Sequence, residues 1–327
     1  MKKILLIGGA GYVGSVIAED LLKKEFSVMV IDNFLYENDL CLKNLFEYKS
    51  FTLVKADLAK LEKCNIEISE ETDVIILGGL VGDPITKKYP KLNDEINING
   101  IKKCIDFFDN KKIGKLIFIS TCSNYGLIDK DQTADEDFQL KPLSLYAKAK
   151  VEIENYILNK KNSEINYEPI ILRFATAFGL SSRMRFDLTV NEFTFDLLNK
   201  KVLEVYDPET WRPYCHVKDF ARIILLVINE KKNSLNFEVF NCGSDENNFR
   251  KKDIVELIKR KLNDTKVVIK TGDVDPRNYK VNFSKIQKRL NFKAKYSVSF
   301  GIDEIINNFN LFKGKNKKLF GNYEIKK

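Results

Sequence analysis

The feature that most constrains the fold is a glycine-rich turn at residues 8–15, GGAGYVGS, directly after an apolar run at 4–7. Gly8, Gly11 and Gly14 are spaced as GxxGxxG between a predicted strand and a predicted helix. Such a turn lets the backbone approach a phosphate closely, and the following helix offers free N–H groups to an anion. The spacing alone is equally compatible with a plain bend, so its interpretation depends on the rest of the chain.

Strand and helix patterns alternate along the first half of the chain. Near-continuous apolar strands are predicted at 3–7, 28–31, 51–54, 74–77, 115–119 and 170–174. Helical periodicity is found between them, at 12–24, 37–47, 92–109 and 143–160. Apolar strands that alternate with helices are typical of a parallel sheet covered on both faces. The predicted fold class is therefore α/β, with a doubly wound parallel sheet of the Rossmann type.

The pattern becomes more irregular after about residue 175, which predicts a second, smaller α/β part. We expect a dinucleotide-binding domain over 1–175 and a substrate domain over 176–312. Two short segments, 214–219 and 241–244, are expected to return to the first domain. The last fifteen residues, 313–327, form a basic tail without a predicted role. The chain is long enough for two closely packed parts of this kind.

Composition excludes several classes of function. Six cysteines without a CxxC pair and a single histidine, His216, argue against disulfides, zinc and any chemistry that needs two histidines. His216 itself is expected to be a packing residue. The net charge of +8 is compatible with nucleic-acid binding, but many lysines are mixed with acids on predicted helix surfaces. The expectation is a cytoplasmic protein without metal, nucleic-acid or membrane partners.

An acidic residue at the end of the second predicted strand strengthens the nucleotide-binding interpretation. Asp32 follows the glycines by about twenty residues, where a carboxylate can bind the ribose hydroxyls of an adenosine. Because this acid would repel a 2′-phosphate, NAD is favoured over NADP. Asp57 is equally compatible with an adenine contact and with a helix N-cap. The predicted cofactor contacts are Gly8, Gly11, Tyr12, Val13, Gly14, Asp32, Asn33, Asp57, Leu58 and Gly78.

A tyrosine and a lysine supply the candidate chemistry. Tyr146 and Lys150 form YxxxK within the predicted helix 143–160, and residues four apart share one helix face. A nearby ammonium stabilises tyrosinate and lowers the pKa of the tyrosine. The phenol can then take a hydroxyl proton while hydride leaves the same carbon. Upstream, the fifth strand runs into Ser120, Thr121, Cys122 and Ser123, and a hydroxyl at that strand end can hydrogen-bond to the reacting oxygen.

With these motifs the chain resembles the extended short-chain dehydrogenases/reductases, in the NAD-dependent nucleotide-sugar epimerase/dehydratase group. The resemblance extends from residue 3 to about 295 and includes STCSNYG (120–126), LRFATAFG (172–179), RPYCHVKD (212–219) and NCGS (241–244). It implies a tightly bound NAD that is also contacted by Tyr146 and Lys150. It gives the catalytic roles to Thr121, Tyr146 and Lys150, and it places Asn97 near the nicotinamide.

The resemblance also implies a nucleoside-diphosphate sugar, UDP- or GDP-linked, as the substrate. Arg212 matches an arginine that holds the substrate diphosphate, and Arg277 resembles a second one, since a guanidinium fork pairs with two phosphate oxygens. The loop 178–194 is equally compatible with a phosphate site, through Arg183 and Arg185, and with a domain or subunit contact. The predicted substrate contacts are Thr176, Arg185, Asn191, Arg212 and Arg277.

The resemblance further implies a homodimer through the helices 92–109 and 143–160. The apolar residues of these helices, Ile105 and Ile153 among them, are equally compatible with an interface and with the core.

The family's reactions begin with oxidation of the sugar, usually at C4. Cys122 and Ser123 stand where the dehydratases carry Asp-Glu, which disfavours 4,6-dehydration. The segments LVGDP (80–84) and 178–194 resemble members related to a GDP-heptose 4-dehydrogenase of capsule synthesis, which use a keto acid such as 2-oxoglutarate to reoxidise NADH. A 4-epimerase and a net 4-dehydrogenase, in surface-polysaccharide synthesis, both fit. The alternative class is a non-catalytic Rossmann dinucleotide sensor or an RNA-associated scaffold.

Overall fold

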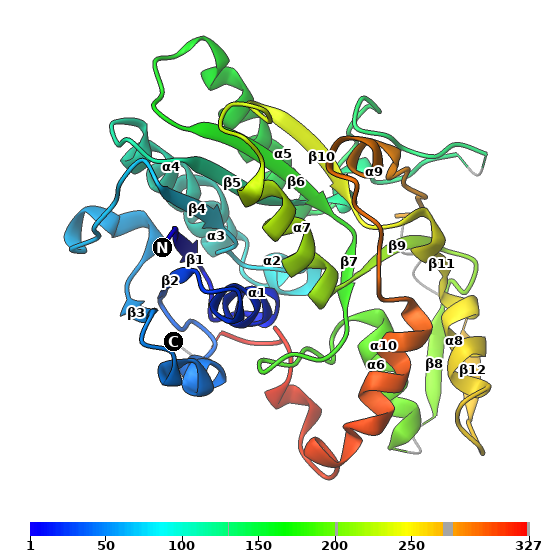
Figure 1. Cartoon of the computed structure of the whole chain (residues 1–327). Helices are drawn as coiled ribbons and strands as arrows, with labels where there is room; N and C mark the ends of the chain where they lie inside the picture. The colour runs from blue at the N-terminus through cyan, green and yellow to red at the C-terminus, as the bar shows by residue number, and fades with distance from the viewer. Residues whose placement is uncertain (130, 200–201, 271–276, 326–327) are drawn as a thin grey trace.

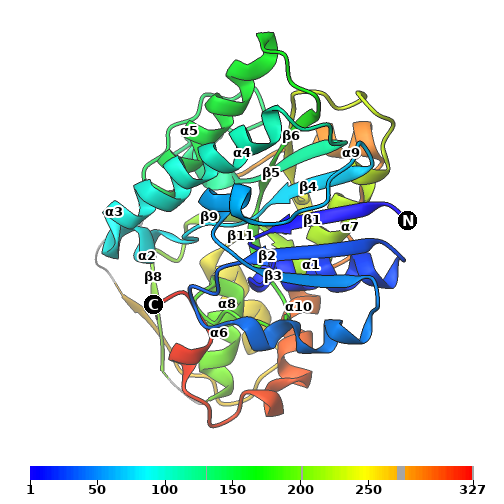
Figure 2. The same cartoon turned by 90° about the vertical axis from the view of Figure 1, so that its left-hand side faces the viewer.

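A seven-stranded parallel sheet forms the centre of the computed structural model, which describes residues 1–129, 131–199, 202–270 and 277–325 (Figure 1). The strands follow the order β10-β6-β5-β4-β1-β2-β3. Figure 2 shows six of them side by side, from β6 at the top through β5, β4, β1 and β2 to β3. This arrangement confirms the predicted doubly wound α/β class. The strands are β1 Lys3–Ile7, β2 Ser27–Asp32, β3 Phe51–Lys55, β4 Thr72–Ile76, β5 Lys115–Thr121, β6 Glu168–Phe174 and β10 Glu238–Cys242.

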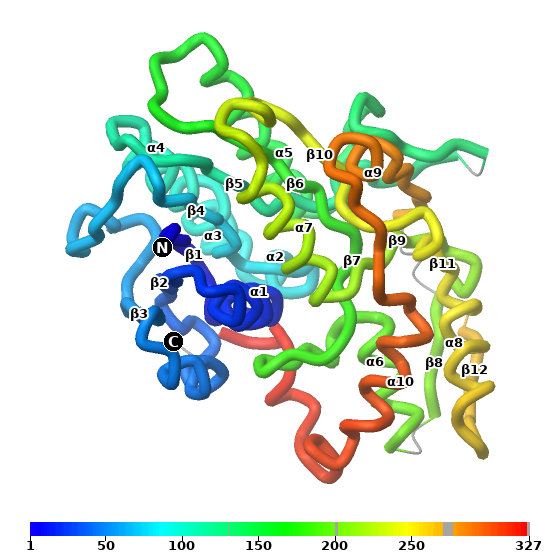
Figure 3. Tube along the Cα trace, in the orientation of Figure 1, coloured from blue at the N-terminus to red at the C-terminus, as the bar shows by residue number. Residues whose placement is uncertain are grey.

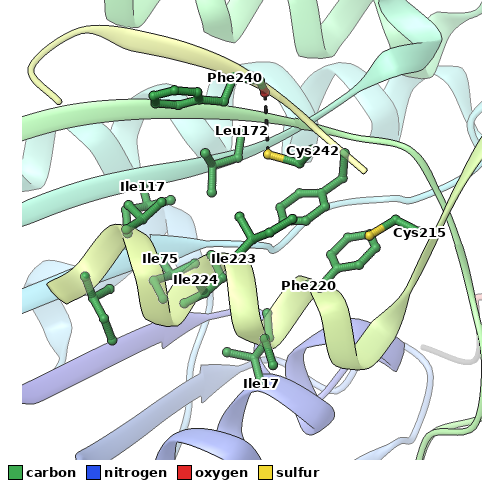
Figure 4. Packing of buried hydrophobic residues seen from close by; sticks show 14 of the residues in the cluster. Ile17, Ile75, Ile117, Leu172, Cys215, Phe220, Ile223, Ile224, Phe240 and Cys242 are labelled. Carbon is green, nitrogen blue, oxygen red and sulfur yellow. Dashed lines mark hydrogen bonds between the residues drawn. The ribbon is translucent and has the colours of Figure 1, made fainter. Parts of the chain in front are cut away.

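Helices cover both faces of this sheet because successive strand residues point to opposite sides. Ile4 and Leu6 of β1 face the layer of α1 (Tyr12–Lys23) and α7 (Val217–Asn229). Figure 4 shows the same layer, in which Ile223 of α7, Ile17 of α1, and Ile117 and Leu172 of the sheet belong to one cluster.

The opposite face of the sheet is covered by α4 (Ile101–Asp109) and α5 (Leu145–Leu158). Leu5 of β1 faces this layer. Ile105 of α4 and Ile153 of α5 are buried within it against the sheet. These two apolar side chains therefore belong to the core.

A smaller part packs beside the carboxyl ends of the central strands. Its strands are β7 Thr176–Phe178, β8 Leu203–Tyr206, β9 Trp211–His216, β11 Asn248–Arg250 and β12 Val267–Lys270. They form a sheet of order β11-β9-β7 and a parallel pair of β12 with β8. Its helices are α6 Thr189–Leu198, α8 Lys251–Lys259 and α10 Val298–Asn307.

The part of the chain that comes back to the large sheet after β7 is longer than the two short segments predicted. All of α7 lies on the large sheet, β10 pairs with β6, and α9 (Ser284–Leu290) contacts β10. By contrast, residues 214–216 belong to β9 of the small sheet.

The predicted helix 92–109 is interrupted. It consists of α3 (Pro90–Asn93), a π-helical segment Asp94–Gly100 and α4, and it is preceded by α2 (Asp83–Lys88). The predicted helix 37–47 is a 3₁₀ helix over Asp39–Glu47. Among the described residues, no helix combines the length and apolarity needed to cross a bilayer.

The C-terminal tail folds back onto the body of the protein. Figure 3 shows this red segment running from α10 towards α1. Phe312 and Phe320 lie edge-on to the buried ring of Phe186, at centroid distances of 5.1 and 5.6 Å. Residues 326 and 327 of the predicted tail lie outside the described residues. The part that is described is therefore packed against the loop that leads into α6.

His216 has a structural role at the start of α7. Its Nδ1 accepts the backbone N–H of Lys218 at 3.1 Å, so the ring proton is assigned to Nε2, which lies 3.0 Å from Glu304. Burial raises the pKa of Glu304, but hydrogen bonds from His216, Lys218 and the Leu180 N–H outweigh it and lower that pKa to about 2. Glu304 therefore joins α10, α7 and the loop after β7.

Replacing Glu304 with alanine is expected to lower the free energy of unfolding by about 2 kcal/mol at pH 7, because buried donors lose a charged acceptor. The carboxyl pKa is depressed on folding, so this contribution is present above about pH 4.5 and is lost as the pH falls towards 2. Urea unfolding of both proteins at pH 7 and pH 3 measures the difference. A destabilisation that does not shrink at pH 3 would contradict this assignment.

Candidate active site

The glycine turn is held tightly between two strand ends. Gly8 has a φ of +80°, and a Cβ there would overlap the backbone of Gly78 after β4. A Cβ on Gly14 would lie 2.6 Å from the carbonyl oxygen of Gly9, so the first turn of α1 packs directly against the backbone of the glycine turn that precedes it. The N-cap residue of α1, Gly11, provides no side-chain hydrogen bond to the helix. The first turn of α1 thus presents backbone N–H groups without a side-chain acceptor, as an anion site requires.

A cavity of about 420 Å³ opens at the carboxyl ends of the central strands, beside this turn. This is the position at which open α/β sheets bind ligands, where the strand order reverses between β1 and β4. Most of the predicted site residues come together here. The cavity is lined by Gly8, Gly11, Tyr12, Val13, Gly14, Asp32, Asn33, Leu58, Gly78, Thr121, Tyr146, Lys150, Thr176, Arg185, Arg212 and Arg277.

Three predicted contacts lie behind the cavity wall instead. The Asp57 carboxylate accepts the N–H of Ala59 at 2.9 Å and caps a 3₁₀ turn. Asn97, 2% exposed, accepts the N–H of Leu80 at 2.7 Å and donates to its carbonyl at 2.9 Å. Asn191, which is fully buried, accepts the Gly179 N–H at 3.0 Å. Each of these side chains binds a backbone group that lies one or two positions along the chain from a residue lining the cavity.

Lys150 is buried beneath Tyr146. Its ammonium donates to the carbonyl of Ile119 at 2.7 Å and lies 5.8 Å from the centre of the Tyr146 ring. Burial lowers the pKa of Lys150 to about 7, against the opposing charge of Glu154. The lysine therefore loses its proton more readily than an exposed lysine does.

The pKa of Tyr146 differs from the expected direction. Burial raises it, the charge of Asp83 adds to this effect, and Arg185 opposes it. Lys150, whose ammonium donates to the Ile119 carbonyl, is not among the groups that shift this pKa. In this state the phenol is protonated and can give a proton to an oxygen; it can take one only after it has ionised.

A buried ion pair supports the end of β5. Glu154 of α5 receives three hydrogen bonds from Arg173, between 2.7 and 3.2 Å, and one from Asn124 at 2.8 Å. Ser120 also donates to this carboxylate. Thr121 follows directly, and its Oγ1 accepts the Ser123 N–H at 3.1 Å. Because that oxygen is used as an acceptor, its hydroxyl hydrogen can point to a reacting oxygen.

The two positions after Thr121 carry no acid. Cys122 is 1% exposed, its Sγ contacts the Arg173 carbonyl at 3.1 Å, and burial raises the pKa of its thiol. Ser123 lines the cavity, 3.1 Å from the hydroxyl of Tyr279. Dehydration needs an acid and a base close to the sugar, and neither residue supplies one at neutral pH.

Two arginines lie together at one end of the cavity. Arg212 of β9 packs 4.9 Å from the ring centre of Tyr279 and donates to the backbone of Trp211 and Arg277. Arg277 pairs with Asp83. Two guanidinium groups that line a cavity suit a diphosphate.

Several cavity residues were not predicted from the sequence. Tyr36, Asn38, Asp83, Tyr279 and Asn322 all line it. Tyr279 is two residues from Arg277, which is the only nearby signal; nothing in the tail sequence singles out Asn322. In the described part of the chain, no group of three His, Cys, Asp or Glu side chains could hold a metal ion.

Comparison with known proteins places this cavity in a family. The model of the NAD dependent epimerase/dehydratase family matches residues 4–243. The chain belongs to this family. It is similar to the uncharacterized UDP-glucose epimerase YtcB of Bacillus subtilis, with 28% identity over 95% of this chain and 99% of that protein.

Solved structures show the same fold. UDP-glucuronic acid 4-epimerase of Bacillus cereus, in complex with UDP-glucuronic acid and NAD, has a TM-score of 0.81 and 24% identity, covering 95% of this chain and 99% of that one. The dTDP-glucose 4,6-dehydratase of Bacillus anthracis, in complex with NAD, has a TM-score of 0.82 and 21% identity, covering 98% and 100%.

The residues of this chain fit the family's NAD. Gly8 keeps the turn open to close backbone approach, α1 lacks a side-chain cap, and Asp32 lines the cavity at the end of β2. The buried hydroxyl of Tyr36, on the same wall, has no hydrogen-bond partner among the described residues. These groups match a ligand with a diphosphate and several hydroxyls.

Proposed function

We propose that the protein is a nucleotide-sugar 4-epimerase, which oxidises C4 of a UDP-linked sugar and returns the hydride to the other face. The observation that carries this proposal is the convergence of Thr121, Tyr146 and Lys150 in one cavity with the glycine turn. A dinucleotide sensor or RNA-associated scaffold would not need these three side chains together. The UDP-sugar epimerases among the similar proteins support a uridine nucleotide.

The roles of the residues follow from their positions. Tyr146 takes the proton of the C4 hydroxyl and later gives it back, and Thr121 donates a hydrogen bond to the same oxygen. Lys150 supports the phenolate that takes this proton and that forms again when the proton is returned, since a nearby ammonium stabilises that charge. When bound, NAD supplies the hydride acceptor and a positively charged ring. Arg212 and Arg277 hold the substrate diphosphate.

The choice between epimerase and net dehydrogenase depends on what happens to the keto sugar. The lack of an acid after Thr121 supports retention of the C6 oxygen, so C4 is the only centre that changes. Tight retention of NAD and a homodimer belong to the same proposal. Reoxidation by a keto acid such as 2-oxoglutarate belongs to the dehydrogenase alternative, as does GDP-heptose chemistry.

The test is incubation of NAD-loaded protein with UDP-, GDP-, CDP- and dTDP-sugars, with and without 2-oxoglutarate. We expect a product of unchanged mass and inverted C4 configuration from a UDP-sugar, detected by mass spectrometry and NMR. Loss of two hydrogens, with NADH formed or the keto acid consumed, would identify a dehydrogenase instead. No change in any sugar would overturn the proposal and favour the sensor.

A further inference from the structure

A second pair of arginines, Arg183 and Arg185, lines the cavity on the side of the glycine turn. Their loop is fastened to the first turn of α1, since the Ser181 hydroxyl donates to the carbonyl of Tyr12 at 2.7 Å. The Arg183 guanidinium lies 5.1 Å from the ring centre of Tyr36, close to the end of β2. Arg183 therefore lies on the cofactor side of the cavity, whereas Arg185 reaches the loop after β4, where its Nη2 lies 3.5 Å from the Val81 carbonyl.

The charges of this pair are not balanced within the described part of the chain. Asp187 accepts two hydrogen bonds from Arg185, from Nε at 3.0 Å and from Nη2 at 2.6 Å. Arg183 has no carboxylate partner there; it donates only to the carbonyl of Gly321, at 3.3 Å. Burial and the neighbouring Arg185 lower the pKa of Arg183 to about 10. A partly desolvated guanidinium without a counter-ion is costly unless an anionic ligand completes the site.

The C-terminal segment, residues 312–325, holds the arginine loop in place. The Phe186 N–H donates to the Phe320 carbonyl at 2.7 Å, and the Tyr323 hydroxyl donates to the Phe186 carbonyl at 3.1 Å. Asn322 donates its backbone N–H to Asp187 at 3.2 Å and its side-chain amide to the Val81 carbonyl at 3.0 Å. Asn322 thus connects the loop after β4, through Val81, with the loop that carries Arg183 and Arg185, through Asp187.

Asn322 also faces the cavity. It is 8% exposed and lines the cavity wall, and its Oδ1 has no hydrogen-bond partner among the described residues. A buried carbonyl oxygen in this position can accept a hydrogen bond from a ligand hydroxyl or amide. Two observations therefore point to a ligand here: unbalanced positive charge and an unused buried acceptor.

We infer that Arg183 binds the diphosphate of the dinucleotide, and that the C-terminal segment positions its loop through Asn322. A diphosphate bound at the uncapped start of α1 would lie within reach of this loop, because the Ser181 hydroxyl holds the loop against Tyr12. The remaining positive charge of the pair is then neutralised by the cofactor. This inference rests on the NAD dependence of the family and not on the identity of the sugar.

The test compares Arg183→Met with Arg212→Met by calorimetric titration of NAD-free protein with NAD, and separately with UDP. We expect Arg183→Met to weaken NAD binding about 10- to 100-fold and to leave UDP binding unchanged, because a charged hydrogen bond is lost. Arg212→Met is expected to do the reverse. Weaker UDP binding with unchanged NAD binding in Arg183→Met would overturn the inference, as would no change in either.

Thermal unfolding without ligand separates binding from a structural role. Removal of an unbalanced guanidinium should leave the melting temperature of NAD-free Arg183→Met equal to or above that of the parent protein, while the rise caused by NAD becomes smaller. A large drop without ligand would show that Arg183 is structural. If UDP does not bind the parent protein, the proposed substrate fails, but the NAD comparison still decides the inference.

The role of the tail is tested by Asn322→Ala, with Glu324→Gln as the matched control on the same segment. Glu324 makes an exposed ion pair with Lys88. We expect a three- to tenfold loss of NAD affinity for Asn322→Ala and none for Glu324→Gln. Equal affinity in both variants would remove the tail from the inference.

Discussion

Replacement of Tyr146 with phenylalanine is expected to lower kcat about 10²- to 10⁴-fold, the usual contribution of a positioned acid or base. The ring stays in place and only the hydroxyl is lost, so the fold and NAD affinity should be preserved. Initial rates on the best substrate, together with calorimetric titration of NAD, measure the two effects. The expected result is a loss of turnover without a loss of binding.

Tyr156→Phe is the matched control because it removes a hydroxyl from the same helix. Tyr156 donates to Asp106 on the outer side of α5 and does not line the cavity. The Tyr156→Phe variant should therefore keep nearly full activity. If Tyr146→Phe retained more than about a tenth of the activity, or if both variants lost it equally, Tyr146 would not be the proton-transfer residue.

Replacement of Glu154 with glutamine is expected to lower the free energy of unfolding by about 3–5 kcal/mol, since it breaks a buried ion pair and leaves a charge without its partner. Glu154 is 1% exposed and Arg173 is 5% exposed, so water cannot replace the lost carboxylate. The neutral amide would also set N–H groups against those of Arg173 and Asn124. Urea unfolding followed by circular dichroism measures the loss.

Glu152→Gln on the same helix provides the comparison. Glu152 pairs with Lys102 on the surface, where an ion pair contributes less than about 1 kcal/mol. A loss of similar size in the two variants would mean that the buried network is not a major source of stability. The network would then be important mainly for the position of Ser120 and Thr121.

Local patterns predicted most of the fold and the centre of the site. The apolar runs predicted the six strands from β1 to β6, and YxxxK placed Tyr146 and Lys150 on one face of α5. These features depend on near neighbours in the chain, which a single sequence contains. The interruption of the helix 92–109 was not predicted. Its π-helical segment places Asn97 against the loop after β4, where it accepts the Leu80 N–H.

Features that depend on distant partners could not be predicted in the same way. An asparagine looks the same in a sequence whether it faces a ligand or, as with Asn191, binds backbone. The spacing of Tyr146 and Lys150 did not show that the Ile119 carbonyl takes the ammonium. The place of Asn322 depends on aromatic packing between the tail and Phe186, across more than a hundred residues.

The central claim is that hydride leaves C4 of a nucleotide-linked sugar inside this cavity. Its most direct test is incubation of NAD-loaded protein with UDP-glucose and UDP-glucuronic acid that carry deuterium at C4. We predict that one of them is turned over and that its label is recovered at C4 of the epimer. Recovery of the label only in water would contradict the claim, as would no turnover of any sugar in the full panel of nucleotide sugars.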